Sequence, residues 1–150
     1  MENLEIILPE IFLSLTIMFL LLFGVFKNNS SKLTYNLTTL SLIILFALLL
    51  NLYQASDLSI FNNSYKVDSL ATFMKLLTIG SGIFVMLTSS KYIEINNINK
   101  MEYPILILSS ILGMMVMISS NDLIVFYMGL ELQSLALYVL ASFNRENLLS

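Results

Sequence analysis

The sequence predicts an all-helical integral membrane protein with about five transmembrane helices. Its 150 residues are 57% hydrophobic and only 11% charged, and the mean hydropathy is +0.86. Soluble domains carry about 25% charged residues, so this composition is typical of a membrane protein. Five apolar segments follow one another and form one membrane domain over residues 1–150. They span about 7–26, 35–53, 69–90, 103–119 and 123–143, lengths suited to helices that cross a bilayer.

Segment 7–26 is expected to remain in the mature protein as a membrane helix. A secretory signal begins with cations, whereas Glu2 and Glu5 precede this segment. Pro9 suits the first turn of a helix, where its missing N–H would have no partner. Glu10 beside it suits the positive end of the helix dipole. We therefore predict that Pro9 and Glu10 mark the start of the first helix.

The later segments are separated by short polar stretches rich in Asn, Ser and Lys. Segments 103–119 and 123–143 are joined by a few residues only, so we expect a tight antiparallel helix pair with Asn121 or Asp122 as the N-cap. Small residues in the third and fourth segments allow helix backbones to approach closely. These are Thr78, Gly80, Gly82, Ser109 and Gly113.

Lys75 is the one cation inside the third segment. It lies about 10 Å from the nearer end of that helix, within reach of the membrane interface for a long side chain. Snorkelling to the interface is therefore the expected role, and a proton relay is the alternative. Asp68 shares the helical face of Lys75, so a water-linked contact is conceivable, although a plain N-cap is the simpler role for Asp68.

Charged residues in the connecting stretches predict the orientation of the chain. Five cations fall on one side of the membrane and Lys66 alone on the other, a bias that places the five on the inner face. The N-terminus then lies outside and the C-terminus on the matrix or cytoplasmic face; in a mitochondrion the outside would be the intermembrane space. The five are Lys27, Lys32, Lys91, Lys100 and Arg145.

Glu131 is an acid near the middle of the fifth segment, about 12 Å from its first residue. An ionisable group at such a depth costs at least about 2.5 kcal/mol and by default marks an ion or proton pathway. At 100° per residue, Tyr127, Ser134 and Tyr138 share its helical face and form a polar stripe able to orient a carboxyl or hold water. The alternative is a glutamate that only bonds a neighbouring helix. Glu131 has no evident cationic partner in the sequence.

The chain has no cysteine and no histidine. These residues supply the usual ligands of iron–sulfur clusters, zinc and most haems, so no redox cofactor or metal is expected on this chain. The net charge of −3 is sorted by position along the chain, and no basic patch that would indicate nucleic-acid binding is present.

Two stretches carry a resemblance to a known family. Ser119-Ser-Asn-Asp-Leu123 followed by Glu131-Leu-Gln-Ser-Leu135 is similar to subunit 2 of mitochondrial NADH dehydrogenase, the counterpart of bacterial subunit N in respiratory complex I. Leu8-Pro9-Glu10-Ile11 and Glu102-Tyr-Pro also fit, so the resemblance runs over essentially the whole chain.

The resemblance implies a proton-translocating, antiporter-like subunit of NADH:ubiquinone reductase in the mitochondrial inner membrane. Glu131 matches a glutamate of the family's line of membrane charges, which pairs with a lysine on the seventh helix. FMN, iron–sulfur clusters and ubiquinone belong to other subunits. Partners would be other complex I membrane subunits, lipids and a companion chain, or further sequence, that carries the missing helices. Two alternatives stay open: an assembly scaffold without proton transfer, and part of a related cation–proton antiporter.

Overall fold

The computed structural model describes residues 2–26, 31–51, 58–60, 65–67, 69–95 and 102–148. Five helices account for nearly all of them, which confirms the predicted all-helical membrane class. They are α1 (Glu2–Phe26), α2 (Ser31–Asn51), α3 (Ser69–Ile95), α4 (Glu102–Ser119) and α5 (Leu123–Leu148). Two three-residue strands, β1 (Leu58–Ile60) and β2 (Tyr65–Val67), pair antiparallel between α2 and α3.

Four helices are long and apolar enough to cross a membrane: α1, α2, α3 and α5. In α4 the apolar run is shorter, Tyr103–Ser119, but this helix lies in the centre of the bundle and packs against each of the other four. Leu108, Ile111 and Met115 of α4 are buried and belong to the hydrophobic core. The central position explains why an unbroken apolar sequence is needed there, since every face of α4 meets another helix.

The α1 helix begins earlier than the sequence indicates, and this changes the role of two residues. It starts at Glu2, so Pro9 lies inside the helix and the prediction of Pro9 in the first turn is wrong. Proline inside a helix removes one backbone hydrogen bond. Glu10 is therefore not at the start of α1 either, but about 12 Å along it.

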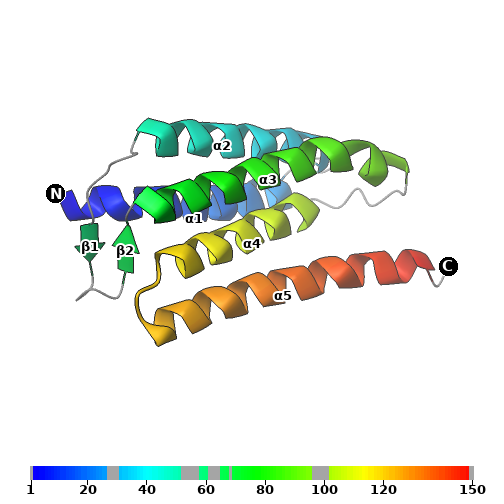
Figure 1. Ribbon diagram of the computed structural model, residues 1–150. Coiled ribbons are helices and arrows are strands. Elements are labelled where there is room, and N and C mark those ends of the chain that lie inside the picture. The colour runs from blue at the N-terminus through cyan, green and yellow to red at the C-terminus, as the bar shows by residue number, and fades with distance from the viewer. Residues whose placement is uncertain are drawn as a thin grey trace.

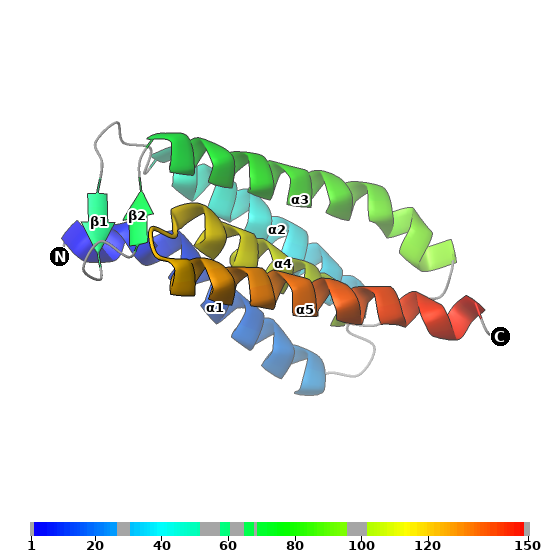
Figure 2. The same ribbon diagram turned by 60° about the horizontal axis from the view of Figure 1, so that its bottom comes forward.

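Figures 1 and 2 show the arrangement of the bundle. The N-terminus, the β-hairpin, the starts of α3 and α5 and the finish of α4 lie together, and we call this the hairpin end. There β1 contacts α1, while β2 contacts α3 and α4. The α5 helix lies at the edge of the bundle, mainly against α4, and only 11% of its span Leu123–Ser142 is buried, against 22–33% in the other three spans. One side of α5 is thus open.

Candidate functional site

Close contact between two glycines fixes the rotation of α5 on α4. A Cβ added at Gly113 would lie 2.7 Å from the backbone nitrogen of Gln133 and 2.8 Å from the backbone oxygen of Gly129. One added at Gly129 would lie 2.9 Å from the backbone oxygen of Gly113. Because no side chain larger than hydrogen fits, the backbones of the two helices touch here. The face of α5 that carries Gly129 is therefore held against α4.

The predicted polar stripe of α5 points away from this contact. Glu131, two residues after Gly129, is exposed, and the side chains of Tyr127 and Tyr138 are exposed on the same side. Ser134 is half-buried at the margin of the stripe. The Tyr127 hydroxyl, one turn before Glu131, donates a hydrogen bond to its carboxylate. The structure thus brings Tyr127 and Glu131 into contact, while Glu131 itself faces the open side of α5.

The turn between α4 and α5 positions the start of the stripe. The backbone N–H of Phe126 donates to the carbonyl of Asp122 at 3.0 Å, which puts Asp122 at the N-cap position of α5 as predicted. The backbone N–H and the hydroxyl of Ser120 both donate to the carbonyl of Met117, at 3.2 and 2.7 Å, and close the last turn of α4. This compact turn keeps α4 and α5 antiparallel and side by side.

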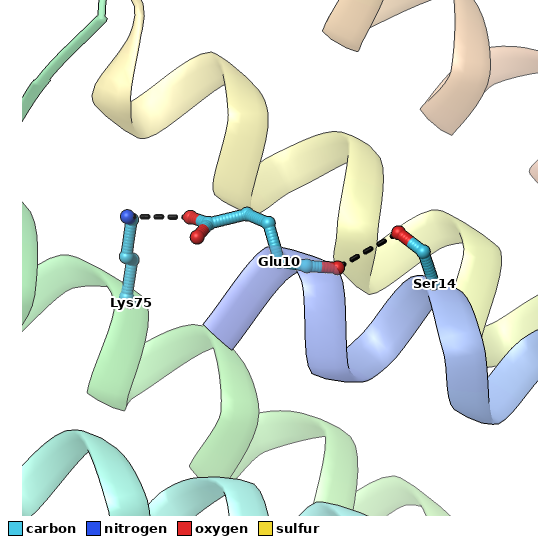
Figure 3. A network of polar contacts seen from close by, with 3 residues as sticks. All are labelled: Glu10, Ser14 and Lys75. Atoms are coloured by element: carbon cyan, nitrogen blue, oxygen red, sulfur yellow. Dashed lines mark hydrogen bonds and ion pairs between the residues drawn. The ribbon is translucent and has the colours of Figure 1, made fainter. Parts of the chain in front are cut away.

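A second ionisable site lies inside the bundle, between α1 and α3. The Lys75 ammonium and a Glu10 carboxylate oxygen are 2.5 Å apart, and the two side chains are 1% and 6% exposed (Figure 3). The prediction that Lys75 snorkels to the interface is wrong, because its side chain crosses to α1 and stays buried. The expected contact of Lys75 with Asp68 involves a residue outside the described part of the chain. The role given to Glu10, a helix start, is replaced by an internal ion pair.

The Glu10–Lys75 pair was missed because each helix was considered alone. Within the candidate spans Ile7–Gly24, Leu70–Ser89 and Leu123–Ser142, the charged residues are Glu10, Lys75 and Glu131, one per span. One cation and two acids in separate apolar helices indicate that the cation pairs with one of the acids, since an isolated charge is costly in such surroundings. Distance along the chain gives no hint as to which acid it takes.

Several buried polar atoms in the described residues have no hydrogen-bond partner. Glu10 Oε2 is one, because Lys75 binds only the other oxygen of that carboxylate. The Ser119 hydroxyl, at the hairpin end of α4, is a second. The Thr34 and Tyr35 hydroxyls are two more. The Ser14 and Thr38 hydroxyls, in contrast, donate to a carbonyl one turn earlier, that of Glu10 at 2.8 Å (Figure 3) and that of Thr34 at 2.7 Å. Buried polar atoms without partners are uncommon in native proteins, so Glu10 Oε2 requires an explanation.

An apolar groove of about 430 Å³ runs between α3, α4 and α5. It is lined by apolar residues and a few hydroxyls, and two of these, Thr78 and Ser81, already donate to backbone carbonyls of their own helix. None of its lining residues is charged. In the part of the chain that the structure describes, no group of acidic side chains is arranged to hold a metal ion. Among the described residues, the charged groups within the apolar spans are Glu131 and the Glu10–Lys75 pair.

Comparisons with known proteins agree with this arrangement. No family model matches the chain. It is 62% identical over 150 residues to NADH-quinone oxidoreductase subunit N of Pelagibacter ubique, which covers 100% of the chain and 32% of that relative. It is 42% identical over 148 residues to subunit N of Bartonella bacilliformis, covering 99% and 30%. The chain thus spans about a third of the length of these curated relatives, in their N-terminal part.

A solved structure shares the fold. Respiratory complex I from Thermus thermophilus with bound Aureothin contains a chain that matches 92% of this one with a TM-score of 0.77. The matched region is 30% of that chain, and the sequence identity is 23%. The five-helix arrangement is therefore a fold shared with a chain of that structure.

Proposed function

Because the chain belongs to the subunit N family of NADH-quinone oxidoreductase and aligns with its N-terminal part, we propose that it works in the membrane arm of respiratory complex I. Its part there is to contribute Glu131 to a proton-translocating path. The observation that carries this proposal is the position of Glu131, a carboxylate about 12 Å into an apolar helix, on a face that the rest of this chain leaves open. Intramembrane acids are seldom retained without an ion or proton to handle.

A helix that carries a cation is expected to cover the exposed face of α5 and to neutralise Glu131. Glu131 interacts with the Tyr127 hydroxyl, but a phenol cannot neutralise a carboxylate in a low-dielectric setting. The relatives are about three times as long, so helices beyond these 150 residues are available in the family to cover α5. We infer that one of them brings a lysine to Glu131, either as a continuation of this polypeptide or as a companion chain. A change in that ion pair would bind or release a proton.

Electron transfer is assigned to other parts of the complex. The family resemblance implies that FMN, iron–sulfur clusters and the quinone site lie on other subunits. These 150 residues contain no cysteine or histidine, the usual protein ligands of iron–sulfur clusters. The chain is then part of an enzyme, NADH:quinone reductase, without a redox centre of its own. Other membrane-arm subunits and lipids on the exposed apolar helix faces complete its surroundings.

The orientation proposed from the cation count puts the hairpin end on the outer face and the C-terminus inside. The chain is a multi-pass membrane protein, and the membrane is the one that complex I energises. A mitochondrial inner membrane was expected from the resemblance, while the relatives named above are bacterial and favour the cytoplasmic membrane of a bacterium. Protease protection of tags placed at the two termini of the assembled subunit tests the orientation.

The experiment that tests the proton path is Glu131→Gln in the assembled complex, because glutamine keeps the shape of the side chain but cannot ionise. Membrane vesicles are compared for NADH oxidation and for protons moved per NADH. We expect assembly to survive and proton movement to fall. Leu135→Met, one turn further along the same exposed face, is the matched control and should leave both quantities unchanged. A normal proton yield in assembled Glu131→Gln complex refutes the role.

A second function, an assembly scaffold, is favoured by the same open face of α5. On this alternative Glu131 only satisfies a contact with the covering helix and handles no proton. Glu131→Gln would then reduce the amount of assembled complex, while whatever complex forms would pump normally. Native gels stained for NADH dehydrogenase activity, run beside the vesicle assay, separate the two functions.

A further inference from the structure

The Glu10–Lys75 pair is the strongest feature that the proposed path through Glu131 does not use. Both side chains are almost completely buried, and the two residues are 65 positions apart in the sequence, on α1 and α3. One carboxylate oxygen binds the ammonium, and the other, Glu10 Oε2, is buried without a partner among the described residues (Figure 3). A carboxylate oxygen without a partner has lone pairs that can accept a hydrogen bond from water or a proton.

Stability alone gives little reason to keep such a pair. Removing two charges from water offsets most of their mutual attraction, and a well-packed apolar pair at the same positions is often as stable or more so. An apolar pair would also leave no orphan oxygen. Inside a membrane the default meaning of a buried ionisable residue is a role in moving an ion or a proton.

The pair is buried among helices near the hairpin end of the bundle. The helices packed against α1 and α3 are α2 and α4, and their spans Leu33–Asn51 and Tyr103–Ser119 contain no charged residue. The hairpin contacts α1, α3 and α4 at the end of the bundle where α3 begins (Figure 1). Glu10 and Lys75 lie about 12 and 9 Å along their helices from that end. Strand β2 includes Tyr65 and Lys66. The other two charged side chains that the structure describes, Asp122 and Glu131, are exposed.

We propose that Glu10 and Lys75 form a proton-exchange site of their own, reached from the hairpin end and separate from Glu131. A proton from water at that end adds to Glu10 Oε2 and gives a neutral carboxylic acid beside the Lys75 ammonium. The net charge of the pair rises from zero to plus one, and release of the proton restores the ion pair. No electron and no other group is transferred. As a step in pumping, this site rests on the function proposed above.

The test uses the whole complex in membrane vesicles and reads two signals. The first is the infrared band of a protonated carboxyl during a pH titration, and the second is the number of protons moved per NADH. We expect a titrating carboxyl band in the wild type and in Glu131→Gln that is missing in Glu10→Gln. We also expect Glu10→Gln/Lys75→Gln, which removes both charges and leaves neither unpaired, to assemble with a lowered proton yield.

Two further variants separate proton exchange from packing. Glu10→Lys/Lys75→Glu keeps an ion pair but moves the carboxylate from α1 to α3. The proposal is supported if this variant assembles and moves fewer protons per NADH than the wild type. Ser14→Ala, which removes only a hydroxyl bonded to the Glu10 carbonyl, is the matched control and should behave as wild type.

The proposal is overturned by any of three results. The first is a titration in which neither Glu10→Gln nor Glu10→Gln/Lys75→Gln removes a carboxyl band. The second is a normal proton yield in Glu10→Gln/Lys75→Gln. The third is failure of both of these variants to assemble while the swapped pair assembles and pumps normally. The carboxyl titration does not depend on pumping. Loss of the Glu131 role would therefore leave the band in place, and the two failures are distinguishable.

Discussion

Gly113→Ala places a methyl group where α4 and α5 touch. The new Cβ would lie 2.7 Å from the Gln133 nitrogen and 2.8 Å from the Gly129 oxygen, and both are backbone atoms that cannot rotate away. Ordinary contact needs about 3.5–4.0 Å, so the two helices have to separate by about 1 Å. Overpacking of this kind costs about 1–3 kcal/mol. Alanine in place of glycine returns about 1 kcal/mol through helix propensity, so the net effect is destabilising by up to about 2 kcal/mol.

Gly80→Ala supplies the matched control for this substitution. Its added methyl would lie 3.8 Å from Phe46 Cε2, an ordinary contact, so only the favourable propensity term applies. Gly82→Ala falls between the two, because the atom it meets at 2.5 Å is Ile111 Cδ1, the mobile tip of a side chain. The expected order of stability is thus Gly80→Ala first, Gly82→Ala second and Gly113→Ala last.

Heat inactivation of the assembled complex measures this order. A cost of 1–2 kcal/mol lowers the midpoint by a few degrees. Gly113→Ala should also reduce the proton yield before it reduces NADH oxidation, because separating α5 from α4 displaces Glu131 relative to whatever covers it. A Gly113→Ala complex as heat-stable as Gly80→Ala, with full proton yield, would show that the backbones do not touch as described.

Three further expectations concern the ionisable residues. Lys75→Met leaves a buried carboxylate at Glu10 without its cation and should lower the stability of the bundle by about 3–5 kcal/mol. Lys75→Met/Glu10→Gln removes that charge as well and should restore most of the loss. The level of assembled complex on native gels measures both effects. Tyr127→Phe removes the hydrogen bond to Glu131 and should lower the proton yield less than Glu131→Gln does; an equal or larger loss would contradict an orienting role. Leu135→Cys introduces the single thiol of the chain on the exposed face of α5. A maleimide should label this thiol in the isolated subunit but not in the assembled complex. Equal labelling in both would argue against a helix that covers α5.

Much of the fold is readable from the sequence because apolar segments of membrane length have few alternatives to a helix. The rotation of α5 could also be anticipated, since the polar stripe and Gly129 fall on opposite faces of one helical wheel. The structure adds the reason for that rotation, a glycine contact with Gly113. Sequence patterns within one helix do not identify the residue on another helix that it meets.

The beginning of α1 shows where local rules fail. Proline is favoured in the first turn of helices, yet Pro9 lies well inside α1, where tertiary packing offsets the missing hydrogen bond. The same assumption placed Glu10 at a helix end and concealed its role in the bundle. The snorkelling argument for Lys75 failed similarly, because it compared one side chain with lipid and left out the carboxylate on a neighbouring helix.

Charge balance connects the two sites of the chain. Three charged residues lie within the apolar spans that the structure describes, and the bundle neutralises two of them internally by pairing Glu10 with Lys75. The third, Glu131, is directed outward by the Gly113–Gly129 contact and interacts with the Tyr127 hydroxyl. Lys75, the cation within the described apolar spans, is already paired with Glu10. These helices therefore offer no second cation that could neutralise Glu131. On the function proposed above, the counter-charge arrives with the helix that covers α5, so assembly of that face and the acid–base chemistry of Glu131 would be a single event.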